Sequence, residues 1–339
     1  MLVIEGLALT YDRRANLNKA TRIAGLVVVL AAGAAMHTGA SAQAYPGKPV
    51  RIIVPYPAGI GFDVLVRAMA QDMSKSVGQP VLVENRPGVS TIVGAEAAPD
   101  GYTTCVVSRD TLSFNPALRP KLPYDPVKDF DVVAPLVFQT SVLAINAAVP
   151  ANNVQELVAL ARAKPGALNY GSIGPGSVTH MFLEVLKIKN GVDIVHVPFN
   201  GPAPLVNALV GNQMQIAYFS AASTVGHIKG GKLRALAVSG NRRSPLLPDV
   251  PAVSELGIAD IDDRVWYAML MPVGSPKDAI ARMNAEVGKL YSNAVFRDER
   301  LIGQGWEPIT DSVEQFQRFI IANRKVGAEM VKISGAKVE

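Results

Sequence analysis

The stretch Arg51-Ile-Ile-Val-Pro-Tyr-Pro-Ala-Gly-Ile-Gly-Phe-Asp63 joins a β-branched run to a glycine-containing loop and the start of an amphipathic segment. Residues 51–55 predict a strand, and residues 63–77 predict a helix with one apolar side that ends at Gly78. A strand, a tight loop and a helix in this order form the first half of a βαβ unit. We therefore expect an α/β fold.

The same alternation continues along the chain. Further strands are predicted at 80–84, 102–107, 141–146, 168–170, 194–197, 215–219, 234–238 and 265–271, with helices at 92–97, 153–163, 178–187, 204–210 and toward the C-terminus. The middle block is complete enough to form its own sheet. We therefore predict two lobes, each a mainly parallel sheet flanked by helices: residues 45–146 plus 266–339, and residues 147–265. Two crossings between lobes predict a hinge, with the ligand site in the cleft.

Residues 1–44 have the organisation of a signal peptide. A basic region precedes the apolar stretch 23–36, which is short for a membrane span of about 20 residues. Small residues then offer cleavage after Ala42 or Ala44. General secretion is the default route, and the Arg13-Arg14 pair leaves twin-arginine export open. We expect a soluble, unanchored periplasmic protein with no intrachain disulfide, because Cys105 is the single cysteine.

Charge and composition argue against several classes of function. The formal net charge is +5, and it falls to +3 once the four basic and two acidic residues of the leader are removed. The basic residues are scattered, which argues against nucleic-acid binding. The histidines are dispersed and no paired carboxylates suggest acid-base chemistry, so we expect no metal site, no cofactor and no enzymatic activity.

The loops that follow strands are the candidate binding elements, because ligands of open α/β sheets bind beyond the carboxyl ends of strands. In the first loop, Gly59 and its neighbours allow close backbone approach, and the following helix offers free N–H groups to an anion. The alternative is a tight turn with Asp63 as an ordinary N-cap. Candidate residues in this loop are Ala58, Gly59, Ile60, Phe62 and Asp63.

A second loop, residues 172–180, is also rich in glycine and leads into a helix. It lacks the endings of a nucleotide-binding loop, and His180 is either a base for Ser177 or a capping and packing residue. Its candidate residues are Ser172, Gly174, Ser177 and His180.

After the third strand, Arg109 either holds a ligand carboxylate bidentately or forms a local pair with Asp110. Its neighbours Ser108 and Thr111 are candidates with it. In the second block, Phe199, Asn200 and Phe219 lie where they either line the cleft or pack in the core.

The motifs together resemble one family. They are Tyr45-Pro-Gly-Lys-Pro-Val-Arg-Ile-Ile-Val-Pro-Tyr-Pro-Ala-Gly59, Val83-Glu-Asn-Arg-Pro-Gly88, Ala98-Pro-Asp-Gly-Tyr102, Leu122-Pro-Tyr-Asp-Pro126, Asn169-Tyr-Gly-Ser172, His196-Val-Pro198 and Leu247-Pro-Asp-Val-Pro251. In this order they resemble the Bug family of tripartite tricarboxylate transporter receptors, over essentially the whole chain after the leader.

The resemblance implies a periplasmic binding protein of the type II, Venus-flytrap fold. Such a receptor closes on a small carboxylate and delivers it to a two-subunit integral membrane transporter; we expect a monomer. The resemblance implies ligand contacts by backbone groups and waters at Ala58, Gly59, Asp63, Thr111, Ser172, Ser177 and His180. A sensory subunit for a two-component kinase, or a hydrolase acting in the cleft, are the alternatives.

Four departures from the family pattern bear on the ligand. Ile60 replaces a glycine, and Phe62 is bulkier than usual. The small hydroxyl-rich loop after the third strand is Arg109-Asp110 here, and the family's acid near Tyr218 to Ser220 is Phe219. We therefore expect an aromatic or partly apolar mono- or dicarboxylate, with Arg109 on a second acid group, and we expect an amine-bearing ligand to be disfavoured.

Overall fold

The computed structural model describes residues 45–59, 61–119, 121–257 and 264–336. Residues Lys48–Glu339 form a unit separate from Met1–Gly47, and the predicted signal peptide lies outside the described residues. Within the described ranges, no helix combines the length and apolar character needed to cross a membrane.

The first sheet has six strands in the order β11-β4-β10-β3-β1-β2. Its strands are β1 (Val50–Val54), β2 (Val81–Asn85), β3 (Thr103–Ser108), β4 (Phe130–Gln139), β10 (Val265–Pro272) and β11 (Trp306–Pro308). Strand β1 pairs in parallel with β2 and β3, whereas β10 is antiparallel to β3 and β4, and β11 to β4. This sheet therefore collects strands from both ends of the unit.

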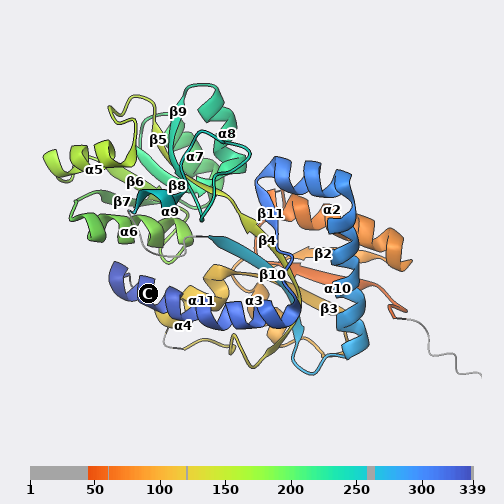
Figure 1. The fold of residues 1–339 in the computed structure, drawn as a ribbon. Coiled ribbons are helices and arrows are strands. Elements are labelled where there is room, and N and C mark those ends of the chain that lie inside the picture. Colours follow the sequence, from red (N-terminus) through yellow and green to blue (C-terminus); the bar gives the residue numbers. More distant parts are fainter. Residues whose placement is uncertain (1–44, 60, 120, 258–263, 337–339) are drawn as a thin grey trace, which may run out of the picture. The chain divides into compact units, whose positions relative to one another are not determined.

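Helices cover both faces of the first sheet (Figure 1). Helices α2 (Gly61–Val77) and α10 (Lys277–Ser292) lie on one face, and α3 (Ser90–Ala95), α4 (Asn115–Leu118) and α11 (Val313–Ser334) lie on the other. Alternate strand residues such as Ile53, Cys105 and Trp266 pack against α3 and α11 in a buried cluster. The residues between them face α2 and α10, because successive side chains of a strand point to opposite faces.

The second sheet has five strands in the order β7-β6-β8-β5-β9. Its strands are β5 (Ser141–Asn146), β6 (Asn169–Ser172), β7 (Val195–Pro198), β8 (Ile216–Ser220) and β9 (Leu233–Val238). Its helices are α5 (Val154–Ala163), α6 (Val178–Asn190), α7 (Pro202–Val210), α8 (Ala221–Lys229) and the short α9 (Val253–Leu256). Each sheet thus has its own core, as in a two-lobed fold.

The prediction that the sheets are mainly parallel is wrong, because both are mixed. In the second sheet β6 pairs in parallel with β7 and β8, but β5 is antiparallel to β8 and β9. The cause is the crossing of the chain. A strand that arrives from the carboxyl end of β4 enters the second sheet at the carboxyl ends of its parallel strands, and so must run against them.

The first crossing lies at Thr140, which separates β4 in the first sheet from β5 in the second. The Thr140 N–H donates to the carbonyl of Gly305, and the Thr140 carbonyl accepts from Ala221, with both distances 2.9 Å. The predicted first lobe included residues 141–146, but this segment pairs in the second sheet. The return strand β10 begins at Val265, one residue before the predicted boundary.

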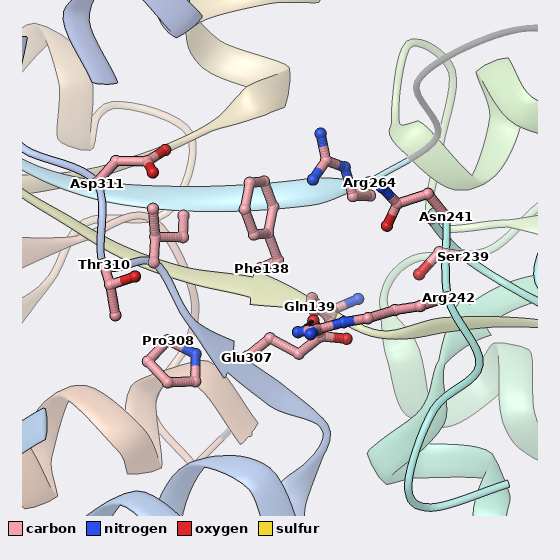
Figure 2. Close-up of a pocket in the computed structure, with 12 residues that line it drawn as sticks. Phe138, Gln139, Ser239, Asn241, Arg242, Arg264, Glu307, Pro308, Thr310 and Asp311 are labelled. Carbon is pink, nitrogen blue, oxygen red and sulfur yellow. Dashed lines mark hydrogen bonds and ion pairs between the residues drawn. The ribbon is translucent and has the colours of Figure 1, made fainter. Parts of the chain in front are cut away.

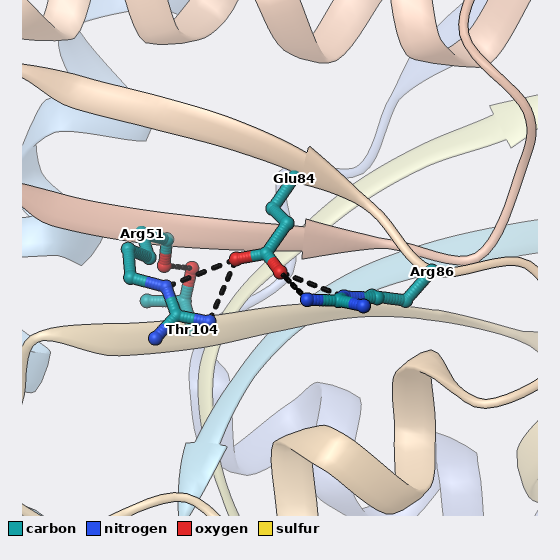
Figure 3. A network of polar contacts seen from close by, with 4 residues as sticks. All are labelled: Arg51, Glu84, Arg86 and Thr104. Carbon is teal, nitrogen blue, oxygen red and sulfur yellow. Dashed lines mark hydrogen bonds and ion pairs between the residues drawn. The ribbon is translucent and has the colours of Figure 1, made fainter.

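A charged network lies on the outside of the first sheet (Figure 3). The Arg51 guanidinium donates to Glu84 across adjacent parallel strands, with Nη2 and Oε2 2.7 Å apart, and the Arg86 Nε donates to the other carboxylate oxygen at 2.7 Å. Arg51 and Arg86 are about half exposed, so these pairs contribute at most about 1 kcal/mol each to stability. We assign this network no role in binding.

Candidate functional site

A cavity of about 830 Å³ is lined by loops and strands of both sheets; we call it the intersheet cavity. From the first sheet it receives the loop after β1, Pro87 after β2, Asp110 after β3, Gln139 at the end of β4, and residues of β10 and β11. From the second sheet it receives the loops that follow β6, β7 and β8. The cavity thus lies beyond the carboxyl ends of six strands, β1, β2, β3, β6, β7 and β8, where a ligand site is expected in an open α/β sheet.

Four helices begin at the intersheet cavity. Lining residues include Gly61 and Phe62 of α2, Val178 and Thr179 of α6, Pro202 and Ala203 of α7, and Ala222 and Ser223 of α8. The first N–H groups of a helix have no partner within the helix and carry the positive end of its dipole. In α7 the residues Pro202 and Pro204 have no N–H, and in α6 the Val178 N–H already donates to Asp110, so these two helices offer fewer free donors than α2 and α8. No Lys, Arg or His is among the described residues that line the cavity. An anion in the cavity would therefore be held by backbone N–H groups and hydroxyls.

The loop after β1 is held in place by Asp63. The Asp63 side chain is fully buried, and its carboxylate accepts hydrogen bonds from the Gly59 N–H at 2.8 Å, Arg67 Nε at 2.9 Å and Asn85 Nδ2 at 2.7 Å. Gly59 has φ of +85°, a conformation that glycine adopts without strain. Burial raises the pKa of Asp63, but the bonds from Arg67, Gly59 and Asn85 more than offset it and lower the pKa below 3.8. Asp63 is therefore an ionised positioning residue of this loop.

Of the other candidates in this loop, Gly59 and Phe62 line the cavity, whereas Ala58 does not. Ile60 lies outside the described residues. The Phe62 ring stacks on Tyr267 with the ring centroids 3.9 Å apart, and Tyr56 and Trp306 pack edge-on against Phe62. The four rings form an aromatic wall, which we define as Tyr56, Phe62, Tyr267 and Trp306.

The prediction that Arg109 binds a ligand acid group disagrees with the structure. The Arg109 side chain is fully buried and does not line the intersheet cavity. Its guanidinium donates to the Arg264 carbonyl at 2.9 Å and to the Met330 sulfur at 3.4 Å, and it lies over the Phe114 ring. The reason is local: residues 110–114 form a π-helical turn packed on α11. Successive residues of such a turn point in different directions, so Asp110 faces the cavity and Arg109 faces α11.

Ser108 and Thr111 bond to each other instead of lining the cavity. The Thr111 hydroxyl donates to the Ser108 carbonyl at 2.9 Å and accepts from the Ser108 N–H at 3.2 Å. These bonds close the turn that begins at Asp110. Both residues therefore shape the loop.

The candidates of the second loop also shape their own backbone. Ser177 caps α6, accepting from the His180 N–H, and its hydroxyl donates to the Gly174 carbonyl at 2.7 Å. Ser172 Oγ lies 2.7 Å from His196 Nε2 and accepts from the Gly174 N–H. None of Ser172, Gly174, Ser177 and His180 is among the residues that line the cavity. Instead their neighbours Ile173, Val178 and Thr179 line it.

The contacts of the His180 ring in the described part of the chain are with backbone and with other rings. Its Nδ1 accepts from the Gly176 N–H at 3.3 Å, and its ring lies 4.3 Å from the His196 ring. Burial lowers the pKa of His180. The Ser177 hydroxyl donates to a backbone carbonyl, so the capping and packing interpretation of His180 agrees with these contacts.

In the second block, Asn200 and Phe219 line the cavity, while Phe199 packs against the hydrophobic core of the second sheet. Several lining residues were not predicted from the sequence, above all Asp110, Gln139 and three members of the aromatic wall: Tyr56, Tyr267 and Trp306. Tyr56 stands in the motif that was singled out, and Asp110 was considered only as a partner of Arg109. Trp306 had no signal in the sequence, because its approach to Phe62 at the start of α2 depends on the antiparallel pairing of β11 with β4.

A second cavity of about 340 Å³ lies where the chain crosses between the sheets (Figure 2). It shares Gln139 with the intersheet cavity, and three of its charged residues, Arg242, Arg264 and Glu307, contact protein neighbours. Arg242 Nη2 pairs with Glu307 Oε2 at 2.6 Å, and the Arg264 guanidinium lies 4.4 Å from the centroid of the Phe138 ring. This cavity lies beside the first crossing of the chain, at Thr140.

Comparison with known proteins gives consistent matches over most of the chain. The model of one protein family, the tripartite tricarboxylate transporter family receptor, matches residues 65–335 of this chain. A UPF0065 protein of Bordetella pertussis is 34% identical over 303 residues, covering 88% of this chain and 92% of its own length. Protein BugT of the same organism is 31% identical, covering 94% of this chain and 99% of its own.

Solved structures match as well. The periplasmic binding protein BugD superposes with a TM-score of 0.77 at 28% identity, covering 87% of this chain and 100% of its own. An R. palustris protein solved with adipate superposes with a TM-score of 0.79 at 26% sequence identity, covering 86% of this chain and 99% of its own. MatC from Rhodopseudomonas palustris with bound malate superposes with a TM-score of 0.75 at 28% sequence identity, covering 85% of this chain and 100% of its own.

Proposed function

Because this chain belongs to the tripartite tricarboxylate transporter receptor family, a family of periplasmic solute-binding receptors and not of enzymes, we propose that it captures a small carboxylate in the intersheet cavity. Its family, its two-lobed periplasmic binding protein fold and its nature as a non-enzymatic receptor were predicted from the sequence and are confirmed. Its ligand, the residues that bind it and the membrane partner belong to the proposal.

The observation that carries the proposal is the meeting of four helix N-termini at a cavity of about 830 Å³ lined by no cationic side chain of the described residues. Each N-terminus stabilises a nearby negative charge by about 0.3 to 1 kcal/mol, and more when the charge is partly buried. N–H groups of fixed direction suit a carboxylate, which accepts several hydrogen bonds at once. The arrangement favours a solute that carries a carboxylate.

The aromatic wall favours a ligand whose body is apolar. Phe62 and Tyr267 present stacked rings, and Trp306 contacts both with its centroid within 5.9 Å. Phe219 adds an apolar surface from the second sheet. Burying an apolar chain or ring against these groups contributes roughly 25 cal/mol per Å². The two neighbours solved with adipate and malate indicate a size for the ligand, and our proposal is an aromatic or partly apolar carboxylate.

Delivery to a two-subunit integral membrane transporter is the proposed outcome of binding. We propose export by the leader 1–44, with cleavage after Ala42 or Ala44, and action as a monomer. We also propose that residues 141–264 form the lobe that moves about the crossings at Thr140 and Val265 when ligand binds. The alternative, presentation of the loaded form to a sensor kinase, predicts a kinase gene beside this one in place of transporter genes.

A thermal-shift panel tests carboxylate binding. A ligand that binds the folded state alone stabilises it by about 2.7 kcal/mol at a concentration one hundred times its Kd, which raises the unfolding midpoint by several degrees. We expect benzoate, adipate or a related acid to raise the midpoint of residues 45–339. The matched neutral compounds, benzamide and adipamide, should leave it unchanged. Equal shifts with the acids and the amides would contradict the proposal.

A further inference from the structure

Asp110 supplies the intersheet cavity with an acidic group that the proposed function leaves unused. It follows β3 and begins the π-helical turn 110–114, and it lines the cavity. Its Oδ1 atom is buried and accepts no hydrogen bond from the described residues. Buried acceptors of folded proteins are normally paired, and an unpaired one at a functional site calls for an explanation.

The described groups that face Asp110 leave its Oδ1 without a hydrogen-bond donor. Arg109, its neighbour in sequence, directs its guanidinium to Arg264 and Met330. The hydroxyls of Tyr56 and Tyr267 are near enough that the charge of Asp110 contributes to raising the pKa of both, although burial is the main cause. These tyrosines bond to each other, with their oxygens 3.4 Å apart.

The balance of these effects leaves a carboxylate that is mostly ionised at neutral pH. Burial raises the pKa of Asp110 to about 6, against the Arg109 charge and the Val178 N–H, which both lower it. The expectation that this cavity disfavours an amine rested on Phe219 in place of an acid. Phe219 does line the cavity, but Asp110 brings an acid from the other sheet.

We propose that Asp110 is a specificity residue, which accepts a hydrogen bond from a hydroxyl or ammonium group carried by the carboxylate ligand. The inference rests on the proposed function, since it assumes a carboxylate held at the helix N-termini. A second carboxylate facing Asp110 would meet a like charge, whereas a donor would satisfy the buried Oδ1. The ligand class is therefore a partly apolar carboxylate with a hydrogen-bond donor away from its acid group.

Calorimetric titration of residues 45–339 with two matched series tests this specificity. The aromatic series is benzoate, para-hydroxybenzoate, para-aminomethylbenzoate and terephthalate; the aliphatic series is butyrate, gamma-hydroxybutyrate, gamma-aminobutyrate and succinate. In at least one series, we expect a donor-bearing acid to bind more tightly than its parent acid by roughly tenfold or more. A hydrogen bond to a charged group contributes enough binding free energy for a factor of this size. A gain for the hydroxyl or for the ammonium identifies which donor the ligand carries.

Two variants assign that gain to Asp110. In Asp110→Asn the amide oxygen still accepts a hydrogen bond from a hydroxyl but has no charge. The ammonium-bearing acids should therefore lose their advantage over the parent acids to a greater extent than the hydroxyl-bearing acids do. In Asp110→Leu, which has a similar shape and no acceptor, both advantages should fall below roughly threefold, and the parent acids should bind at least as tightly as they bind the wild type, because a like charge has been removed. Asp72→Asn, at an exposed ion pair of α2, is the matched control and should keep every advantage.

Folding of the variants can be measured separately. Both replacements remove a charge that burial disfavours, so the unfolding midpoint at pH 8 should not fall. Equal binding of donor-bearing and parent acids by the wild type would overturn the inference, as would a donor advantage that survives in Asp110→Leu. Preference for succinate or terephthalate that strengthens below pH 6 would also overturn it, because Asp110 would then donate. If no acid binds, the proposed function fails and this inference with it.

Discussion

Replacing Asp63 with alanine is expected to lower the free energy of unfolding by about 2 to 4 kcal/mol and to weaken carboxylate binding. The substitution removes the acceptor of the Gly59 N–H and of Asn85 Nδ2, and leaves the loop after β1 without its anchor. Gly59 lines the intersheet cavity, so the loss reaches the ligand site. Urea denaturation and calorimetric titration measure the two effects.

The control for this prediction is Asp72→Ala. Asp72 lies on the same helix and pairs with Lys75 at 2.8 Å, but both side chains are exposed. Such exposed pairs contribute about 0.3 to 0.5 kcal/mol to the free energy of unfolding. Asp72→Ala should therefore destabilise the protein only slightly and leave its affinity for carboxylates unchanged. Equal destabilisation by the two substitutions would contradict the anchoring role of Asp63.

The effect of Asp63 should also depend on pH. Its folded-state pKa lies below the ordinary value of 3.8, so the stability it contributes is fully present above 3.8. That contribution is lost as the pH falls through the folded-state value, where the carboxylate takes up its proton. The stability difference between the wild type and Asp63→Ala should therefore narrow at acid pH.

Placing a carboxylate at the start of α8 should separate stability from binding. Ser223 is exposed in the first turn of α8 and lines the cavity. In Ser223→Asp the new charge interacts favourably with the helix dipole and should raise stability by about 0.3 to 1 kcal/mol. The same charge repels a bound carboxylate by on the order of 3 kcal/mol at a separation of ~5 Å, a loss of affinity of roughly a hundredfold.

Gln155→Asp is the matched control for this substitution. Gln155 is exposed in the first turn of α5, which does not line the intersheet cavity. The substitution should give the same small gain in stability without loss of affinity. If Ser223→Asp binds carboxylates as tightly as the control does, the anion does not lie at these helix N-termini.

The α/β alternation could be read from the sequence because the first strand and helix carry distinct periodicities. Strand β4 could not be predicted from the sequence. Its residues are almost all buried, so no alternation marks it, and Pro135 argues against a central strand. The structure accommodates Pro135 at a register shift. Pro135 pairs with Ala268, and the following pair along β4 joins Val137 to Tyr267, so that the residue between Pro135 and Val137 has no partner in this register. Without β4, the first crossing was placed about six residues too late.

The site was predicted at the level of loops better than at the level of side chains. The loops after β1, β3, β6 and β7 all reach the cavity, because strand ends are fixed by topology. Which residue of a loop faces the ligand depends on turn geometry. The π-helical turn after β3 exchanges the expected roles of Arg109 and Asp110, and a capping turn hides Ser177 while it exposes Thr179. Neither geometry has a clear signature in the sequence.

Fluorescence titration tests most directly whether a carboxylate binds in the intersheet cavity. The chain has two tryptophans: Trp306 lines the cavity, and Trp266 is fully buried in the core of the first sheet. In Trp266→Phe the remaining emission comes from Trp306. We predict that its emission changes saturably with an aromatic or aliphatic carboxylate, at the Kd that calorimetry gives. An acid that binds by calorimetry but leaves this emission unchanged, or a failure of all such acids to bind, would contradict the account.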